Sequence, residues 1–326
     1  INGLNQRRLF SLAEAHCQSR LAEPDLEPLA RADLTIALCR TYAQHALNTP
    51  RAKRDALWQA AEQTVDAFRR EHSDNPHAVL VEMQAALTVL ARGELARQEA
   101  EVGAPGAPSL AEARQALQTA VDQLKTVDGQ VEAQLRRVGR NANEAAMSEQ
   151  ELISLQRNVR YQQARALRNQ ALCFAADSPE RSDSLLRALE LLSPLAQLRE
   201  SDALVWNSRI DEIVCLRLRK QFEQASQRIA ALEAARPAPT TQLLAKAERV
   251  RLALSVGEPE NALEILRTGR EIAGRTSAEL DLAHVETFIA LWQAANDAKQ
   301  VDQAAQWQQR AAEMVQAMEQ LYGPYW

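Results

Sequence analysis

Paired helix-forming stretches in the C-terminal half constrain the fold of this chain more than any other feature. The pairs run over residues 151–176 with 179–192, 203–220 with 222–235, 241–256 with 259–273, and 278–297 with 301–321. The second stretch of each pair carries a small residue at a corresponding point, namely Ser184, Ala225, Ala262 and Ala304, with spacings of 41, 37 and 42 residues. Such a period, carried by paired helices, is typical of an α-solenoid. A single pair cannot bury its apolar face alone, so neighbouring pairs are expected to stack, with Leu244, Leu252, Leu254, Leu263 and Ile265 in the contacts.

The turn between paired stretches is clearest at Gly257-Glu258-Pro259, which stops one helix and starts the next. With the following Glu260-Asn261-Ala262-Leu263 it resembles the inter-helix turn of the tetratricopeptide (TPR) family, and Lys220-Gln221-Phe222-Glu223-Gln224-Ala225 is a looser copy. Pro237 stands twelve residues after Ala225, where that family commonly has its terminating proline, and Gly274 takes this place in the next unit. The resemblance implies a right-handed α-solenoid of antiparallel helix pairs.

The chain also departs from the TPR pattern. The tryptophan and glycine that the family has in its first helix are not present at the corresponding positions of this chain. The repeat periods of this chain also exceed the family's usual length of about 34 residues. We therefore expect a divergent, TPR-like packing, and a neighbouring solenoid class such as HEAT would give a similar periodicity.

Composition agrees with an all-α fold. The chain has 326 residues with only 10 glycines and 4% aromatic residues, and it lacks the alternating β-branched runs that indicate strands. Its net charge of −5 gives no electrostatic reason to bind nucleic acid, so no nucleic-acid partner is expected. No run is long and apolar enough to predict a transmembrane segment.

Residues that typically start and stop helices divide the chain into four predicted regions. Residues 1–102 form N-terminal helical hairpins, with segments at about 2–22, 27–47, 50–72 and 76–102; residues 103–108 form a Gly/Pro linker. Residues 109–147 form a long helix, capped by Ser109 and weakened at Asp128-Gly129, followed by an irregular connection. Residues 148–326 form the TPR-like repeats, opened by Ser148 and Glu151 as a capping box.

Motifs of enzyme chemistry were sought and not found. The sequence has no glycine-rich phosphate loop, no G-x-S-x-G and no H-E-x-x-H, so we expect no enzymatic activity, no cofactor and no metal. An unrecognised active site between residues 102 and 148 is the alternative. His72 and His77 could supply metal ligands, but a helix stop followed by a new helix start explains them more simply.

The four cysteines are Cys17, Cys39, Cys173 and Cys215, and each lies among apolar neighbours. Cys173 and Cys215 are 42 residues apart, one repeat, which allows a disulfide or a shared metal site across neighbouring units. Buried packing positions are the favoured interpretation, because neighbouring helix axes about 8–10 Å apart strain disulfide geometry.

A concave surface lined by the first helices is the predicted binding site. Counting back from the small residues in the TPR register gives Arg165, Arg168, Asn207, Arg217, Arg251, Gln293 and Asn296. Several are cationic, so an acidic peptide or a terminal carboxylate is the conceivable ligand. A solvated helix face crossed by ion pairs is the competing interpretation.

These features predict a non-enzymatic helical-repeat scaffold for protein–protein interaction, with a structural spacer or assembly component of a cell-envelope complex as the alternative. Because the chain begins with Ile1, we expect a piece of a longer protein, and the style of bacterial TPR-like proteins favours an extracytoplasmic location. The end of the stack could support a homodimer. The terminal aromatics, residues 321–326, are expected either to precede more chain or to fold back over the last helix.

Overall fold

The described residues form an all-α fold, which confirms the predicted fold class at that level. The computed structural model describes residues 1–103, 106–138, 147–199, 202–268 and 276–323, and over these ranges it contains fourteen α-helices and no strand. The irregular connection at 139–146, Gly274, Tyr325 and Trp326 lie outside the described residues, as do positions 104–105 of the predicted linker. The chain forms two compact units, Ile1–Leu191 and Leu192–Trp326, and the boundary falls within α8 (Pro179–Ala196).

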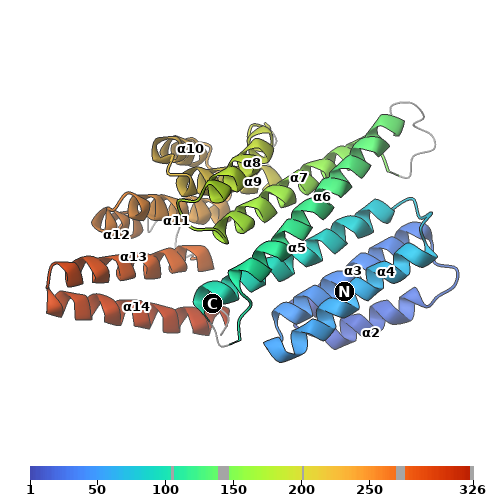
Figure 1. The fold of residues 1–326 in the computed structure, drawn as a ribbon, viewed down its shortest axis with the longest axis horizontal. Helices are drawn as coiled ribbons and strands as arrows, with labels where there is room; N and C mark the ends of the chain where they lie inside the picture. Colours follow the sequence, from blue (N-terminus) through green and yellow to red (C-terminus); the bar gives the residue numbers. More distant parts are fainter. Residues whose placement is uncertain (104–105, 139–146, 200–201, 269–275, 324–326) are drawn as a thin grey trace. The chain divides into compact units, whose positions relative to one another are not determined.

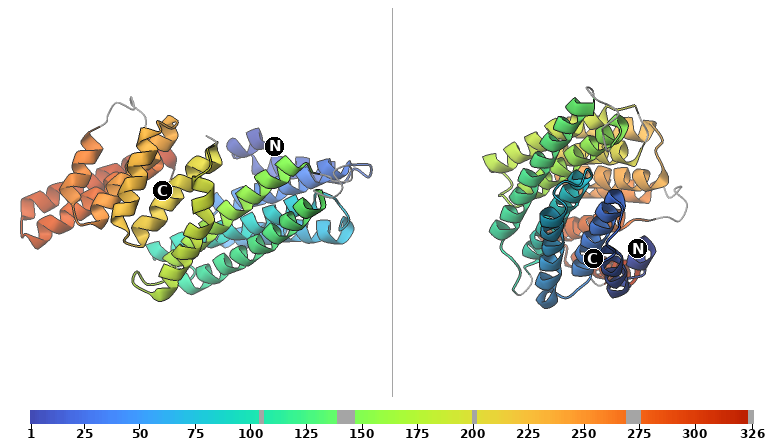
Figure 2. Two further views of the ribbon diagram at one scale, coloured as in Figure 1. Left: turned by 90° about the horizontal axis from the view of Figure 1, so that it is seen from above. Right: turned by 90° about the vertical axis from the view of Figure 1, so that its right-hand side faces the viewer.

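Unit 1 is built from two layers of helices (Figures 1 and 2). Its elements are α1 (Asn2–Gln6), α2 (Phe10–Leu21), α3 (Pro28–Leu47), the 3-10 turn η1 (Arg51–Lys53), α4 (Arg54–Glu71), α5 (Ala78–Val102), α6 (Leu110–Val138) and α7 (Glu149–Leu172). Helices α3, α5 and α7 pack against one another in succession. Helix α4 packs chiefly on α3 and also on α5, and α6 packs on α5 and α7. Helices α4 and α6 therefore belong to the second layer.

Two local features of unit 1 differ from the sequence predictions. The expected first helix over 2–22 is broken at Arg8, which adopts a left-handed φ of 58°, and the Leu9 N–H donates to the Leu4 carbonyl across the break. The weak point expected at Asp128-Gly129 does not interrupt α6, which runs unbroken from Leu110 to Val138. The flanking Val127 and Val131 are buried, and this packing outweighs the cost of about 1 kcal/mol for a glycine inside a helix.

Unit 2 repeats the same arrangement with helix pairs. Its helices are α9 (Ala203–Leu218), α10 (Phe222–Ala234), α11 (Pro239–Ser255), α12 (Pro259–Arg267), α13 (Ala278–Asp297) and α14 (Val301–Tyr322). The first helices α9, α11 and α13 pack in succession. Each second helix packs on its own partner, and α10 and α12 also pack on the next first helix. The predicted pairing of helices is therefore confirmed for the three pairs of unit 2.

The same turn joins the two helices of each pair in unit 2. Lys220, Gly257 and Lys299 have left-handed φ values of 60°, 82° and 59°, and each lies five residues before the small residue of its pair. In each case the next backbone N–H donates to the carbonyl five residues earlier, at 2.9 Å, 3.0 Å and 2.9 Å. This is the Schellman arrangement, which satisfies the last carbonyls of the first helix and reverses the chain. Only one of these three positions is a glycine. The turn geometry is therefore repeated more closely than the amino-acid sequence of the turn.

Burial explains the small residue at the start of each second helix. Ala225, Ala262 and Ala304 are 0%, 0% and 4% exposed, and Ser184 on α8 is 5% exposed. A larger side chain at these points would separate the two helices of a pair, because interiors are close-packed. Leu244 and Leu252 pack against the core cluster around Ile213 and Ile229, while Leu254 and Ile265 pack against the cluster around Val250. Leu263 is half-buried.

The predicted helix starts at Ser109 and Ser148 are confirmed. The Ser148 hydroxyl accepts from the Glu151 N–H, and the Glu151 carboxylate accepts from the Ser148 N–H at 2.8 Å, which is a capping box. Ser109 and Glu112 make the same reciprocal bonds. In unit 2 the hydroxyl of Tyr322, the last residue of α14, donates to Asp281 on α13 at 2.7 Å and so links the two helices.

Candidate functional site

The predicted site residues fall on first-layer helices of both units. Arg165 and Arg168 lie on α7 in unit 1, and both are half-buried. In unit 2, Arg217 and Arg251 are half-buried on α9 and α11. Three others are exposed: Asn207 on α9, and Gln293 and Asn296 on α13. The structure thus places the arginines in packed surroundings and the amides in solvent.

Arg217 and Arg251 are brought together by a carboxylate that the sequence analysis did not single out. Glu248 on α11 accepts from Arg217 Nε at 3.0 Å through one oxygen and from Arg251 Nη1 at 2.8 Å through the other. Arg251 Nε also donates to Glu286 on α13 at 2.9 Å. We call these four residues the unit 2 charge ladder, because it ties α9 to α11 and α11 to α13.

Three of the four members of the charge ladder are shielded from solvent. The Glu248 side chain is 5% exposed, and those of Arg217 and Arg251 are 14% and 17% exposed. Burial alone would raise the pKa of Glu248, but the two guanidinium groups more than offset it and hold the pKa below its usual value. Burial opposes the charge of Arg251 as well, yet Glu248 and Glu286 raise its pKa. The Glu248 and Arg251 side chains are thus ionised near neutral pH.

Arg165 makes a similar contact between helices in unit 1. Its Nε and Nη2 donate to the two oxygens of Glu94 on α5, at 2.6 Å and 2.7 Å, which is a bidentate pair. Asn169 on α7 also donates to Glu94 at 2.8 Å and accepts from Arg97 at 3.1 Å. The arginine therefore joins α7 to α5, as Arg217 joins α9 to α11.

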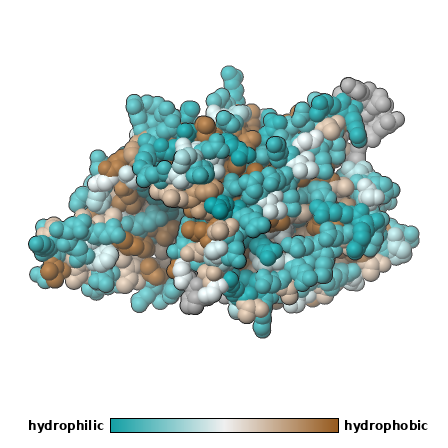
Figure 3. All heavy atoms as spheres, viewed as in Figure 1, coloured by the Kyte–Doolittle hydropathy of each residue, from teal (hydrophilic) through white to brown (hydrophobic). Residues whose placement is uncertain are grey.

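One face of α13 carries a stripe of exposed residues and the half-buried Glu286, which the stripe shares with the charge ladder. Leu282, Glu286, Ile289, Gln293 and Asn296 recur every three or four positions, so they share one face of the helix. Leu282 and Ile289 are 38% and 41% exposed, and Glu286 is the member that reaches Arg251 on α11. The face of the molecule in Figure 3 shows apolar atoms interspersed with hydrophilic ones over unit 2. We call these five residues the α13 stripe.

Sequence reasoning missed Glu94, Glu248 and Glu286 as partners of the predicted arginines. Glu248 lies three residues before Arg251 on α11, a spacing at which opposite charges meet on a helix, so this contact had a local signal. The contacts of Arg217 and Arg165 with carboxylates on neighbouring helices join residues 31 and 71 positions apart and had no such signal.

The cysteines and histidines take the structural places that the simpler interpretations predicted. All four cysteines are buried and none forms a disulfide, and burial raises the pKa of Cys39 to about 12. His72 lies at the end of α4 and His77 immediately before α5. Among the residues that the structure describes, no group of three or more His, Cys, Asp or Glu side chains could hold a metal ion. In the same ranges no helix combines the length and apolarity needed to cross a bilayer.

Comparisons of the chain with protein-family models, with curated proteins and with solved structures found no significant match.

Proposed function

We propose that the chain is a non-enzymatic scaffold of divergent TPR-like helix pairs, stacked as a right-handed α-solenoid, that mediates protein–protein interaction. The support is the repeated unit: three pairs in unit 2 share the same left-handed turn, the same buried alanine and the same packing of first helix on first helix. Stacked pairs present their first helices as a continuous surface, and surfaces of this kind bind peptides and partner proteins.

The α13 stripe carries the proposal. It sets two exposed aliphatic side chains, Leu282 and Ile289, beside the amides of Gln293 and Asn296, and the amides can both donate to and accept from a peptide backbone. A partner segment with aliphatic anchors and accessible peptide groups fits this chemistry.

The charge ladder changes the expectation for acidic ligands. Arg217 and Arg251 are paired with Glu248 inside the packing of unit 2, so they chiefly join helices. An acidic peptide would have to replace Glu286, the most exposed member of the ladder with 37% of its side chain exposed, at Arg251. This exchange remains our prediction for carboxylate-bearing partners, while aliphatic contacts with the α13 stripe supply most of the affinity.

Capture of partners from an extract of the source cells, followed by mass spectrometry, tests the proposal. Ile289→Arg on the α13 stripe is compared with Val315→Arg on α14, since the two native side chains are 41% and 39% exposed. A partner retained by the wild type and by Val315→Arg but lost with Ile289→Arg supports the proposed surface. Partners that all three proteins retain equally contradict it, and the absence of any specific partner favours the structural spacer of a cell-envelope assembly.

A further inference from the structure

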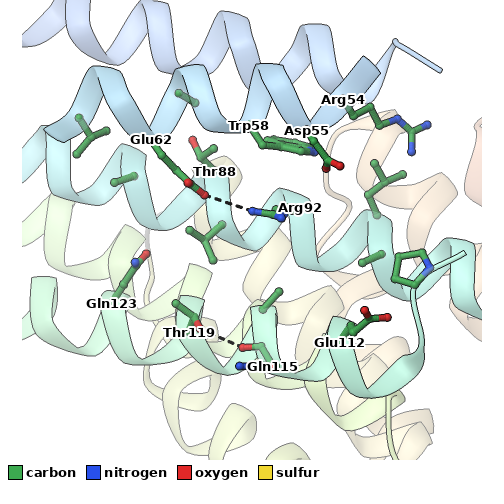
Figure 4. A pocket seen from close by; sticks show the side chains of 18 of the residues that line it. Arg54, Asp55, Trp58, Glu62, Thr88, Arg92, Glu112, Gln115, Thr119 and Gln123 are labelled. Atoms are coloured by element: carbon green, nitrogen blue, oxygen red, sulfur yellow. Dashed lines mark hydrogen bonds and ion pairs between the residues drawn. The ribbon is translucent and has the colours of Figure 1, made fainter. Parts of the chain in front are cut away.

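A second surface lies in unit 1, on the side of α5 that faces α4 and α6. Helices α4 and α6 flank α5 without packing extensively against each other, and an open groove of about 740 Å³ remains between them (Figure 4). The volume is within the range of ligand-binding pockets. Beyond Arg69 the groove continues into a second hollow of about 400 Å³ between the same three helices. The corresponding hollow between α2 and α4, over α3, has a volume of about 350 Å³.

Apolar side chains line part of the floor and lower walls of the groove, beside Thr88, Arg92 and Glu99 of α5. Helix α5 contributes Ala85, Val89 and Ala96 at helical spacing, and α4 contributes Trp58 and Val65. Ridges of another helix pack well against such a row of small and branched side chains. The bottom of the groove can therefore bury aliphatic residues of an occupant.

The α4 wall carries three carboxylates, together with the guanidinium groups of Arg54, which pairs with Glu99, and Arg69. Asp55, Glu62 and Asp66 are exposed and spaced seven and four residues apart, so they share one face of α4. Glu62 pairs with Arg92 at 3.3 Å and Asp66 with Arg69 at 3.0 Å. Asp55 forms no ion pair with any residue that the structure describes. Exposed pairs of this kind contribute about 0–1 kcal/mol, so an incoming cation can readily share these carboxylates.

The α6 wall is uncharged along its middle. Gln115, Thr119 and Gln123 lie four residues apart and face the groove (Figure 4). The side-chain oxygen of Gln123 is buried and accepts no hydrogen bond from the described residues. A buried acceptor without a donor is costly, so an occupant that offers an N–H or O–H group favours rotation of the Gln123 amide into the groove.

The groove also indicates the secondary structure of its occupant. Its walls and floor are helices whose backbone groups are already bonded, so an extended strand could not pair its own backbone there as it does at a sheet edge. A helix satisfies its own backbone and needs only side-chain contacts. The α6 wall from Glu112 to Gln123 spans about 17 Å at 1.5 Å per residue, which corresponds to three helical turns.

From these observations we infer that the α4–α5–α6 groove docks an amphipathic helix of a partner protein with a basic edge. Its aliphatic residues face Val89 and Trp58, its lysine or arginine side chains lie along Asp55 and Glu62, and a donor group reaches Gln123. The site lies wholly in unit 1 and is independent of the α13 stripe.

Selection from a displayed library of 16-residue helix-forming peptides, with the full chain as bait, tests the inference. We expect enriched sequences with aliphatic residues at i, i+4, i+7 and i+11 and with Lys or Arg along one flank. Asp55→Lys should weaken the best peptide about fivefold or more, since reversing a charge at the rim opposes a basic edge. Asp33→Lys, an exposed change of the same charge on α3 outside the groove, should leave its affinity unchanged.

Two further variants complete the design. Ala96→Phe fills the floor and should abolish binding, and circular dichroism shows whether that variant folds. Ile289→Arg should not change the affinity of the selected peptides. A result against the groove can therefore be distinguished from a result against the partner surface proposed on the α13 stripe. The inference is overturned if no sequence is enriched, if the enriched peptides have an acidic edge or a two-residue alternation, or if Asp55→Lys does not change their affinity.

Discussion

Replacing Glu248 tests the physical role of the charge ladder. In Glu248→Gln the side chain keeps its size but loses the charge that two guanidinium groups contact at 2.8 Å and 3.0 Å. Removing one partner of a buried ion pair typically costs about 3–5 kcal/mol. We expect about 3 kcal/mol, the lower end, because Arg251 keeps Glu286 and the Arg217 side chain is still 14% exposed.

The pH dependence gives this prediction a second readout. The pKa of Glu248 is lower in the folded state than its ordinary value of 4.5, so the stabilisation is fully present above about pH 4.5 and is lost as the pH falls through the folded pKa. Glu248→Gln should remove the contribution of Glu248 to the pH dependence of the unfolding free energy and leave the contributions of the other carboxylates unchanged.

Urea unfolding followed by circular dichroism and tryptophan fluorescence measures both effects, since Trp206 and Trp292 lie in unit 2. The triple variant Arg217→Met, Glu248→Leu, Arg251→Met is the control, because well-packed apolar replacements of a buried ion network are often close to neutral. A loss below about 0.5 kcal/mol in Glu248→Gln, or a triple variant less stable than the single one, would refute the role assigned to the charge ladder.

The other predictions concern local contacts. Lys299→Gly should raise the free energy of unfolding by about 1 kcal/mol, because Lys299 has a φ of 59° that costs an L-residue about 1–2 kcal/mol; a lower urea midpoint would contradict this. Tyr322→Phe should lower the free energy of unfolding by about 1 kcal/mol by removing the donor to buried Asp281, and a thermal unfolding midpoint equal to that of the wild type would count against the contact. Ala262→Leu should cost about 1–3 kcal/mol by overpacking, whereas Ala234→Leu at an exposed position should be nearly neutral in the same urea titration. The four cysteines should react with Ellman's reagent only after unfolding, and rapid reaction of the native chain would show that they are accessible.

Local chemistry allowed much of the fold to be predicted from the sequence. Gly257-Glu258-Pro259 and the Ser148–Glu151 capping box act within a few residues, so the helix boundaries beside them were predicted correctly. The buried small residues were found from their spacing, because each repeat needs one at the same place. The break at Arg8 had no such signal, since a non-glycine residue takes the left-handed conformation there.

Only the tertiary structure decided what the charged side chains do. The sequence correctly placed Arg165, Arg217 and Arg251 on first helices but could not show that each meets a carboxylate on a neighbouring helix. The groove over α5 likewise depends on how far apart α4 and α6 lie, and no spacing within either helix specifies that separation. Helix boundaries follow from interactions along the chain, whereas ion pairing and grooves follow from packing between helices distant in sequence.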